Sequence, residues 1–185
     1  MKIGVMGDKG SFSDEAALLY VRRKKIKKYS IKYLINADNV LKSLNKKKID
    51  LGILPITNST AGMVKETVKA LKKYPFQLFN SFKMPIRHSL LIQKNNTKEN
   101  VSKIISHIQA LKQCQKYVKK NFPKAKKIEY EDTAIAAKDL ASGKLSKTVA
   151  VIASKNCAEI YGLKILAKNI QDNKKNNTTF LVIRK

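Results

Sequence analysis

The sequence predicts an α/β protein built from mostly parallel sheets with helices packed against them. Strand-like runs alternate with helical patterns from the N-terminus onward, beginning with the buried-strand pattern of residues 2–6. The alternation resumes in a second series after a middle stretch that contains Pro75 and Pro85. This pattern favours parallel strands joined by helical crossovers, and no low-complexity linker or internal repeat interrupts it.

In the first series, strands are expected over residues 2–6, 31–35 and 51–55. A glycine turn follows the first strand, and Ser13 is placed to cap the next helix, with Asp14 and Glu15 in its first turn. The inward positions of the three expected helices are Ala16, Leu19 and Tyr20, then Val40, Leu41 and Leu44, then Val64, Val68 and Leu71.

The second series follows two extended segments within residues 76–93. Strands are expected at 103–106, near 127–130, at 148–152 and at 179–184, with the run 163–170 following the last helix. One continuous helix is expected to carry Ala110, Leu111, Cys114, Tyr117 and Val118 on a single side, and another is expected to begin at Thr133.

The formal net charge is +26, from 39 basic and 13 acidic residues. Only four of the basic residues are arginine, the residue best suited to bidentate phosphate and base contacts, and the lysines spread along the whole chain. Aromatic residues are few and tryptophan is absent, so no stacking platform is evident. We therefore interpret the charge as a solvated surface that attracts small anions, and expect no nucleic-acid partner.

Several classes of site are not supported by the residue pattern. Cys114 and Cys157 match neither a zinc spacing nor a redox pair, so they are expected to be reduced and buried. His88 and His107 lack carboxylate-rich neighbours, so no metal or other cofactor is expected. No apolar run approaches the length of a membrane helix and no signal peptide is apparent, so a cytoplasmic protein without a membrane partner is expected.

Small hydroxyl and amide residues recur where strands give way to helices. In open α/β sheets this is where ligands bind, and helix N-termini there suit anions. The pattern predicts a neutral, donor-rich pocket for a carboxylate ligand. The places are Ser11 and Ser13; Thr57 to Thr60; Ser106 with Gln109 and Gln113; Thr133; and Asn176 to Thr179.

Six segments along the chain resemble, in order, the signature motifs of prephenate dehydratases. They are the turn Gly7–Ser13, LGILPITNSTAGMVKET (51–67), PIRHSL (85–90), SHIQALKQC (106–114), DTAIAA (132–137) and NIQDNKKNNTTF (169–180). The resemblance implies a two-lobed fold similar to type II periplasmic-binding proteins, with the active site in the cleft between the lobes. Lobe one is expected at about 1–75 plus 170–185, lobe two at about 76–169, and a homodimer or higher homo-oligomer is expected.

The resemblance also implies an activity, the conversion of the dicarboxylate prephenate to phenylpyruvate. It assigns the catalytic role to Thr178, which would assist departure of the ring hydroxyl. Substrate-binding roles are implied for Asn58, Ser59, Ser106, Gln109, Gln113, Thr133 and Ser11. Family members often carry a fused regulatory or chorismate mutase domain; neither has room in this sequence, so a stand-alone catalytic domain without feedback inhibition through a fused domain is expected.

The match departs from the family pattern at three positions. Thr57 replaces a glutamate, Thr179 replaces an arginine, and Ile108 replaces a proline. If the arginine holds a carboxylate, Lys174 and Lys175 are candidate substitutes by sequence position. The departures leave two alternatives open: a prephenate decarboxylase that keeps the hydroxyl, and a non-catalytic module that binds small anions. Arogenate as the substrate also stays open.

Overall fold

The structure, a computed structural model, describes all residues 1–185 and forms two compact units. Unit 1 comprises Met1–Ile86 and Lys175–Lys185, and unit 2 comprises Arg87–Lys174. The observed boundaries of the units therefore lie later in the chain than the lobe boundaries expected from the sequence. The first boundary moves because residues 77–85, expected in lobe two, form a strand that pairs with the C-terminal strand of unit 1.

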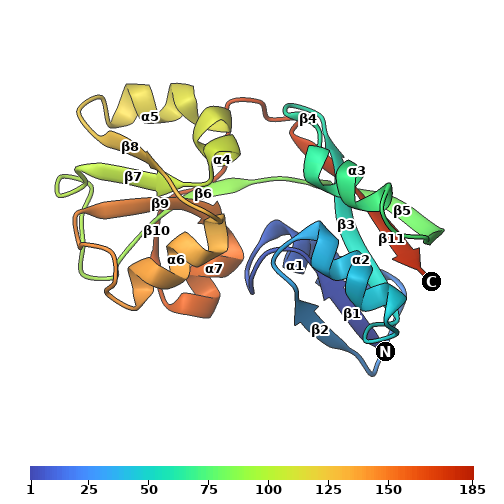
Figure 1. The fold of residues 1–185 in the computed structure, drawn as a ribbon. Helices are drawn as coiled ribbons and strands as arrows, with labels where there is room; N and C mark the ends of the chain where they lie inside the picture. Colours follow the sequence, from blue (N-terminus) through green and yellow to red (C-terminus); the bar gives the residue numbers. More distant parts are fainter. The chain divides into compact units, whose positions relative to one another are not determined.

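Unit 1 contains one sheet in the order β2-β1-β3-β11-β5 (Figure 1). Its strands are β1 (Lys2–Val5), β2 (Ser30–Tyr33), β3 (Leu51–Asn58), β5 (Gln77–Pro85) and β11 (Asn177–Arg184), with the short β4 (Gly62–Met63) paired to β3. Its helices are α1 (Phe12–Arg23), α2 (Ala37–Asn45) and α3 (Lys65–Leu71).

The two faces of the unit 1 sheet are covered by different helices. On one face Ala16, Ala17 and Tyr20 of α1 pack with Ile53 and with Phe180 and Val182 of β11. On the other face Val40, Leu41 and Leu44 of α2 and Ala70 of α3 pack with Leu54 and Ile183. Neighbouring residues of one strand thus enter different cores, as the alternation of side chains along a strand requires.

Unit 2 contains a second sheet in the order β10-β6-β9-β7-β8. Its strands are β6 (His88–Ile92), β7 (Lys103–Ser106), β8 (Lys126–Glu129), β9 (Val149–Ser154) and β10 (Lys164–Ala167). Its helices are α4 (Ile108–Gln113), α5 (Gln115–Asn121), α6 (Thr133–Ala141) and α7 (Lys155–Tyr161). In Figure 1, α4 and α5 cover one face and α6 and α7 the other, and the two cores of the unit divide in the same way.

The α/β class is confirmed, but both sheets are mixed rather than mostly parallel. In unit 1, β1, β2 and β3 run parallel, whereas β11 is antiparallel to both β3 and β5. In unit 2, β7 is parallel to β8 and β9, whereas β6 is antiparallel to β9 and β10. Helical connections predict parallel neighbours, but β5 leaves unit 1 and β11 returns to it, so these two strands run in opposite directions.

Two local expectations were wrong. Ser11, not Ser13, caps α1: its hydroxyl oxygen accepts the backbone N–H of Asp14 at 3.3 Å. The continuous helix expected after Ser106 is divided at Cys114 into α4 and α5. The division has a tertiary cause, because the carboxylate of Asp172 accepts the backbone N–H groups of Lys116 and Tyr117 and so binds the start of α5.

Candidate functional site

Four of the predicted site residues of unit 1 lie at one edge of its sheet. Because β1 and β3 are parallel and β11 is antiparallel to them, the end of β1, the end of β3 and the start of β11 share this edge. Ser11 follows β1, Asn58 and Ser59 stand at the end of β3, and Thr178 stands at the start of β11. The topology therefore brings together residues that are far apart in the sequence.

A register shift in β3 decides which of these side chains meet. Thr179 pairs with Thr57, but the next residue of β11, Phe180, pairs with Pro55, so Ile56 is an extra residue in β3. Such a bulge reverses the side to which the following residues point. Asn58 consequently faces the same side as Thr178, the side that α1 covers through Phe180 and Val182.

Asn58 is buried, and its side-chain amide is fixed in one orientation. Its Oδ1 accepts the backbone N–H groups of Thr60 and Ala61, each at 2.9 Å. Since backbone N–H groups can only donate, the oxygen must face them and the nitrogen must face β11. Nδ2 then donates to the Oγ1 of Thr178 at 2.9 Å and to the Oδ1 of Asn176 at 2.7 Å.

Thr178 is itself buried, and its hydroxyl oxygen accepts the hydrogen bond from Asn58. Because that lone pair is engaged, the hydroxyl hydrogen is directed toward a different acceptor. The neighbour of Thr178 on β5 is Met84, which is also buried. The arrangement is an oriented hydroxyl donor in a buried setting, where a hydrogen bond to a developing charge is strengthened.

Ser59 and Ser11 have local structural roles. The Ser59 hydroxyl donates to the Lys175 carbonyl at 3.2 Å and accepts the Asn177 N–H at 2.9 Å, which ties the end of β3 to the start of β11. Ser11 caps α1, and the Asp14 carboxylate accepts the Gly10 N–H and the Tyr33 hydroxyl nearby. An acidic side chain therefore already lies at the N-terminus that was expected to suit an anion.

The predicted residues of unit 2 also gather at one sheet edge. Ser106 ends β7, and Gln109 and Thr133 lie at the starts of α4 and α6. Ser106 is fully buried and its hydroxyl donates to the Ile152 carbonyl of the neighbouring strand at 2.6 Å. Gln109 is exposed and Thr133 is partly exposed, and Asp132 rather than Thr133 caps α6.

Gln113 is held at both ends. Its backbone carbonyl accepts the Asp172 N–H at 2.7 Å, and its side-chain Oε1 lies 2.8 Å from the Nε2 of His88. His88 is buried, its backbone N–H donates to the Oε1 of Gln171 at 3.0 Å, and its carbonyl accepts the Ile170 N–H. The structure thus joins three of the quoted segments, 85–90, 106–114 and 169–180, around one histidine.

His88, Gln171 and Asp172 are residues that the sequence reasoning did not select as site residues. The His88 ring contacts the Gln113 side chain, the Gln171 side chain accepts the His88 N–H, and the backbone N–H of Asp172 donates to the Gln113 carbonyl. All three stand inside the segments quoted for the resemblance, so the motifs themselves carried a signal. Polar type and position after a strand, the criteria applied, did not find them.

The two threonines that stand where the family motifs have charged residues lie on the other face of the unit 1 sheet. Thr57 and Thr179 are direct cross-strand partners, and they alternate with Asn58 and Thr178. Lys83 of β5 is the neighbour of Thr179 on its other side. The cation beside Thr179 in the sheet is therefore Lys83, which was not among the candidates chosen by sequence position.

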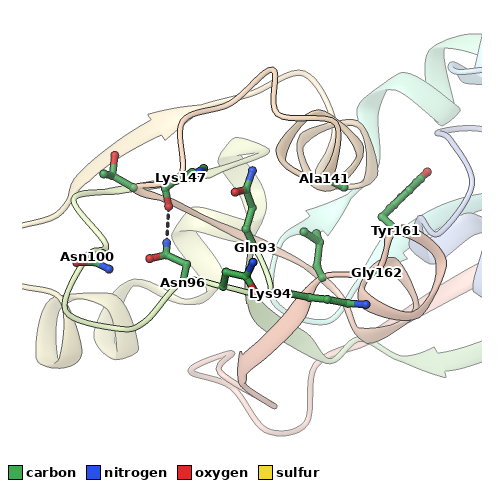
Figure 2. A pocket seen from close by; sticks show the side chains of 11 residues that line it. Gln93, Lys94, Asn96, Asn100, Ala141, Lys147, Tyr161 and Gly162 are labelled. Carbon is green, nitrogen blue, oxygen red and sulfur yellow. Dashed lines mark hydrogen bonds between the residues drawn. The ribbon is translucent and has the colours of Figure 1, made fainter.

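A cavity of about 490 Å³ lies within unit 2 but contains none of the predicted site residues (Figure 2). Its wall includes Gln93, Asn96 and Tyr161. Two of its amides are engaged in holding neighbouring segments: Gln93 donates to the Leu140 carbonyl at 2.8 Å, and Asn96 donates to the Lys147 carbonyl. These contacts hold together the segments that form the cavity wall, and the wall contains no residue of the six motif segments.

Both cysteines are free and buried, as expected from the sequence. Burial raises the pKa of the Cys114 thiol, so this thiol stays protonated and unreactive near neutral pH. No group of three or more His, Cys, Asp or Glu side chains is arranged to hold a metal ion. No helix is both long and apolar enough to span a bilayer.

Fold and site together define a two-unit α/β protein with neutral hydroxyl and amide groups gathered at its sheet edges. The prephenate dehydratase family model matches residues 3–185, and the chain belongs to this family. A bifunctional chorismate mutase/prephenate dehydratase of Neisseria gonorrhoeae is 32% identical over 183 residues, which is 99% of this chain and 49% of that protein. The chain spans about half the length of the curated bacterial relatives it matches.

Two further comparisons extend this result. The chloroplastic arogenate dehydratase 5 of Arabidopsis thaliana is 37% identical over 134 residues, which is 72% of this chain and 31% of that protein. The crystal structure of a prephenate dehydratase from Arthrobacter aurescens, in complex with L-Phe, matches with a TM-score of 0.89 at 24% identity. That match covers 100% of this chain and 60% of the Arthrobacter chain, and at this identity it shows the shared fold.

Proposed function

We propose that the chain converts prephenate to phenylpyruvate, CO2 and water, as a step of phenylalanine biosynthesis. The observation that carries the proposal is the hydrogen bond from Asn58 Nδ2 to Thr178 Oγ1, 2.9 Å, with the Asn58 amide fixed by Thr60 and Ala61. Family membership supplies the substrate, and this contact supplies an oriented hydroxyl donor at the residue to which the family resemblance assigns the chemistry.

The reaction needs little from the protein beyond binding and one hydrogen-bond donor. The bond between the ring and its carboxylate breaks, CO2 leaves, and the electron pair enters the ring. The ring hydroxyl then leaves as hydroxide, which takes one proton from the solvent to become water, and the aromatic product forms. Thr178 donates its hydroxyl hydrogen bond to the departing oxygen, where negative charge develops. Because a threonine is a weak acid, orientation by Asn58 and exclusion of water contribute most of its effect.

The substrate also carries two carboxylates that must be bound. We assign this role to amide and hydroxyl groups of unit 2, with Gln113 as the principal residue and with Gln109 and Thr133 as partly or fully exposed partners. Ser106 is assigned a supporting role, because its hydroxyl hydrogen already bonds Ile152. In unit 1, we assign Ser59 the role of holding the loop after β3, and Ser11 the role of capping the N-terminus of α1.

Product analysis tests the proposal. The purified chain is incubated with prephenate at neutral pH, and phenylpyruvate is followed by ultraviolet absorbance and identified by mass spectrometry, against an enzyme-free control and the Thr178→Val variant. A non-aromatic dihydro product would indicate a decarboxylase instead. Binding by calorimetry without turnover would indicate an anion-binding module. Arogenate is assayed in parallel, since one relative is an arogenate dehydratase.

The cytoplasmic location and the homodimer expected from the sequence stay predictions. Size-exclusion chromatography with light scattering measures the mass in solution against the 20.9 kDa of one chain. A mass that stays at one chain at micromolar concentration would contradict the homodimer.

A further inference from the structure

We propose that His88 is a positioning residue that sets the orientation of the Gln113 side-chain amide and so turns the amide nitrogen, rather than the oxygen, toward the substrate. The inference rests on the proposed function, because it concerns how Gln113 binds a carboxylate. It adds His88, a residue that has no role in the proposed function above.

The first step concerns burial. His88 is 3% exposed, whereas Gln113 is only partly buried. The histidine ring is therefore fixed by packing at the start of β6, and the glutamine end that contacts it is the less constrained partner. A buried, rigid group that contacts a partly exposed polar side chain restricts the rotamers of that side chain and lowers the entropic cost of binding a ligand.

The second step concerns which atom of the amide faces the ring. The contact joins His88 Nε2 to Gln113 Oε1 at 2.8 Å. Burial lowers the pKa of His88, with the Gln113 hydrogen bond acting in the opposite direction, so the ring is neutral near neutral pH. A neutral ring carries one N–H; if Nε2 bears it, the amide oxygen faces the ring and the amide nitrogen points away.

The third step concerns what the ligand requires. A carboxylate accepts hydrogen bonds and donates none. An amide whose nitrogen faces the ligand can donate to it, whereas the flipped amide would present an oxygen and repel the carboxylate. The tautomer of His88 therefore decides whether Gln113 favours or opposes an anionic ligand.

The surrounding contacts allow the ring to be changed without dismantling the segment. The backbone N–H of His88 binds Gln171 and its carbonyl binds Ile170, so both contacts survive a side-chain substitution. The backbone of Gln113 likewise keeps its hydrogen bond from Asp172. His88→Leu removes the ring contact with Gln113, and His88→Gln replaces the ring donor with an amide donor.

The experiment combines kinetics with spectroscopy. Prephenate KM and kcat are measured for wild type, His88→Leu, His88→Gln, Gln113→Leu and the double variant His88→Leu/Gln113→Leu, with thermal melting to confirm folding. We expect KM to rise about tenfold in each leucine variant, no further in the double variant, and to recover in His88→Gln, while kcat changes less. Additive effects in the double variant would overturn the proposal.

The protonation state is measured independently of turnover. In a sample labelled with 15N-histidine, the NMR spectrum distinguishes a protonated from an unprotonated Nε2, and His88→Gln assigns the signal. A protonated Nε2 is expected; an unprotonated Nε2 overturns the proposal. If the wild-type chain does not turn over prephenate, the proposed function fails, and the inference is then decided by this spectrum and by prephenate binding of the same variants in calorimetry.

Discussion

Thr57 and Thr179 are cross-strand partners on β3 and β11, at the two positions where the family motifs have a glutamate and an arginine. Opposite charges at facing positions of antiparallel strands stabilise each other, so we expect the two threonines to be one coupled replacement. The pair lies on the opposite face of the sheet from Asn58 and Thr178. The loss of both charged residues therefore leaves the Asn58–Thr178 contact in place.

A double-mutant cycle tests this coupling. Thr179→Arg alone is expected to destabilise unit 1, because it places a second cation beside Lys83. Adding Thr57→Glu should restore stability, with a coupling free energy of about 0.2–1 kcal/mol in urea unfolding. The matched control is Thr57→Gln with Thr179→Arg, which keeps the size of the side chain without the charge. A coupling energy of zero would contradict a direct pair.

Thr178→Val is expected to lower kcat for prephenate by about 10²- to 10⁴-fold, because it removes the hydroxyl donor. Valine keeps the β-branched shape that suits the buried strand position, so the melting temperature should change little. Thr178→Ser keeps the hydroxyl and should retain most of the activity. A valine variant within threefold of wild type, by ultraviolet assay, would remove Thr178 from the mechanism.

Asn58→Asp separates the two roles of Asn58. The new carboxylate still accepts the N–H groups of Thr60 and Ala61, so the turn after β3 should persist. It no longer donates to Thr178, and it attracts the Thr178 hydroxyl hydrogen away from the substrate. We expect kcat to fall by about tenfold or more, with far-ultraviolet circular dichroism unchanged. Unchanged kcat would show that the orientation of Thr178 does not depend on Asn58.

The burial of His88 predicts that the free energy of unfolding depends on pH. Burial lowers the pKa of His88 in the folded state, so the unfolded chain, with a histidine pKa of about 6.5, binds the proton more readily. The stability contribution is present above pH 6.5 and is lost as the pH falls toward the folded-state pKa. The loss is at most about 1.4 kcal/mol per pH unit.

This dependence is measured by urea unfolding of wild type and His88→Gln between pH 7 and pH 5. The wild-type free energy of unfolding should fall more steeply with decreasing pH than that of the variant. Parallel curves for the two proteins would show that His88 does not titrate on unfolding in this range.

The sequence predicted the α/β class and most elements because these depend on local periodicity and on turn residues. It did not predict the antiparallel pairing of β5 with β11, since residues at 77–85 and 177–184 meet only through tertiary structure. The division between α4 and α5 was missed for the same reason: Asp172, far along the chain, binds the N-terminus of α5.

Within the site, the resemblance selected Asn58, Thr178 and Gln113, and the structure joins the first two by a hydrogen bond. It could not indicate that Thr57 and Thr179 face away from them, because the direction of a side chain after a bulge depends on register. His88 was considered only as a metal ligand, and its contact with Gln113 depends on how β6 is placed beside α4.

The extra residue in β3, Ile56, has a consequence for how this segment tolerates change. Asn58 reaches Thr178 because one unpaired residue shifts the strand by a single position. If Ile56 instead joined the ladder with the chain length unchanged, Thr57 would point to the side of Thr178 and Asn58 to the side of α2 and α3. Deleting Ile56 would keep Thr57 opposite Thr179 and Asn58 opposite Thr178, because the residue removed is the unpaired one. This segment should therefore tolerate loss of the bulged residue better than a substitution that draws it into the ladder.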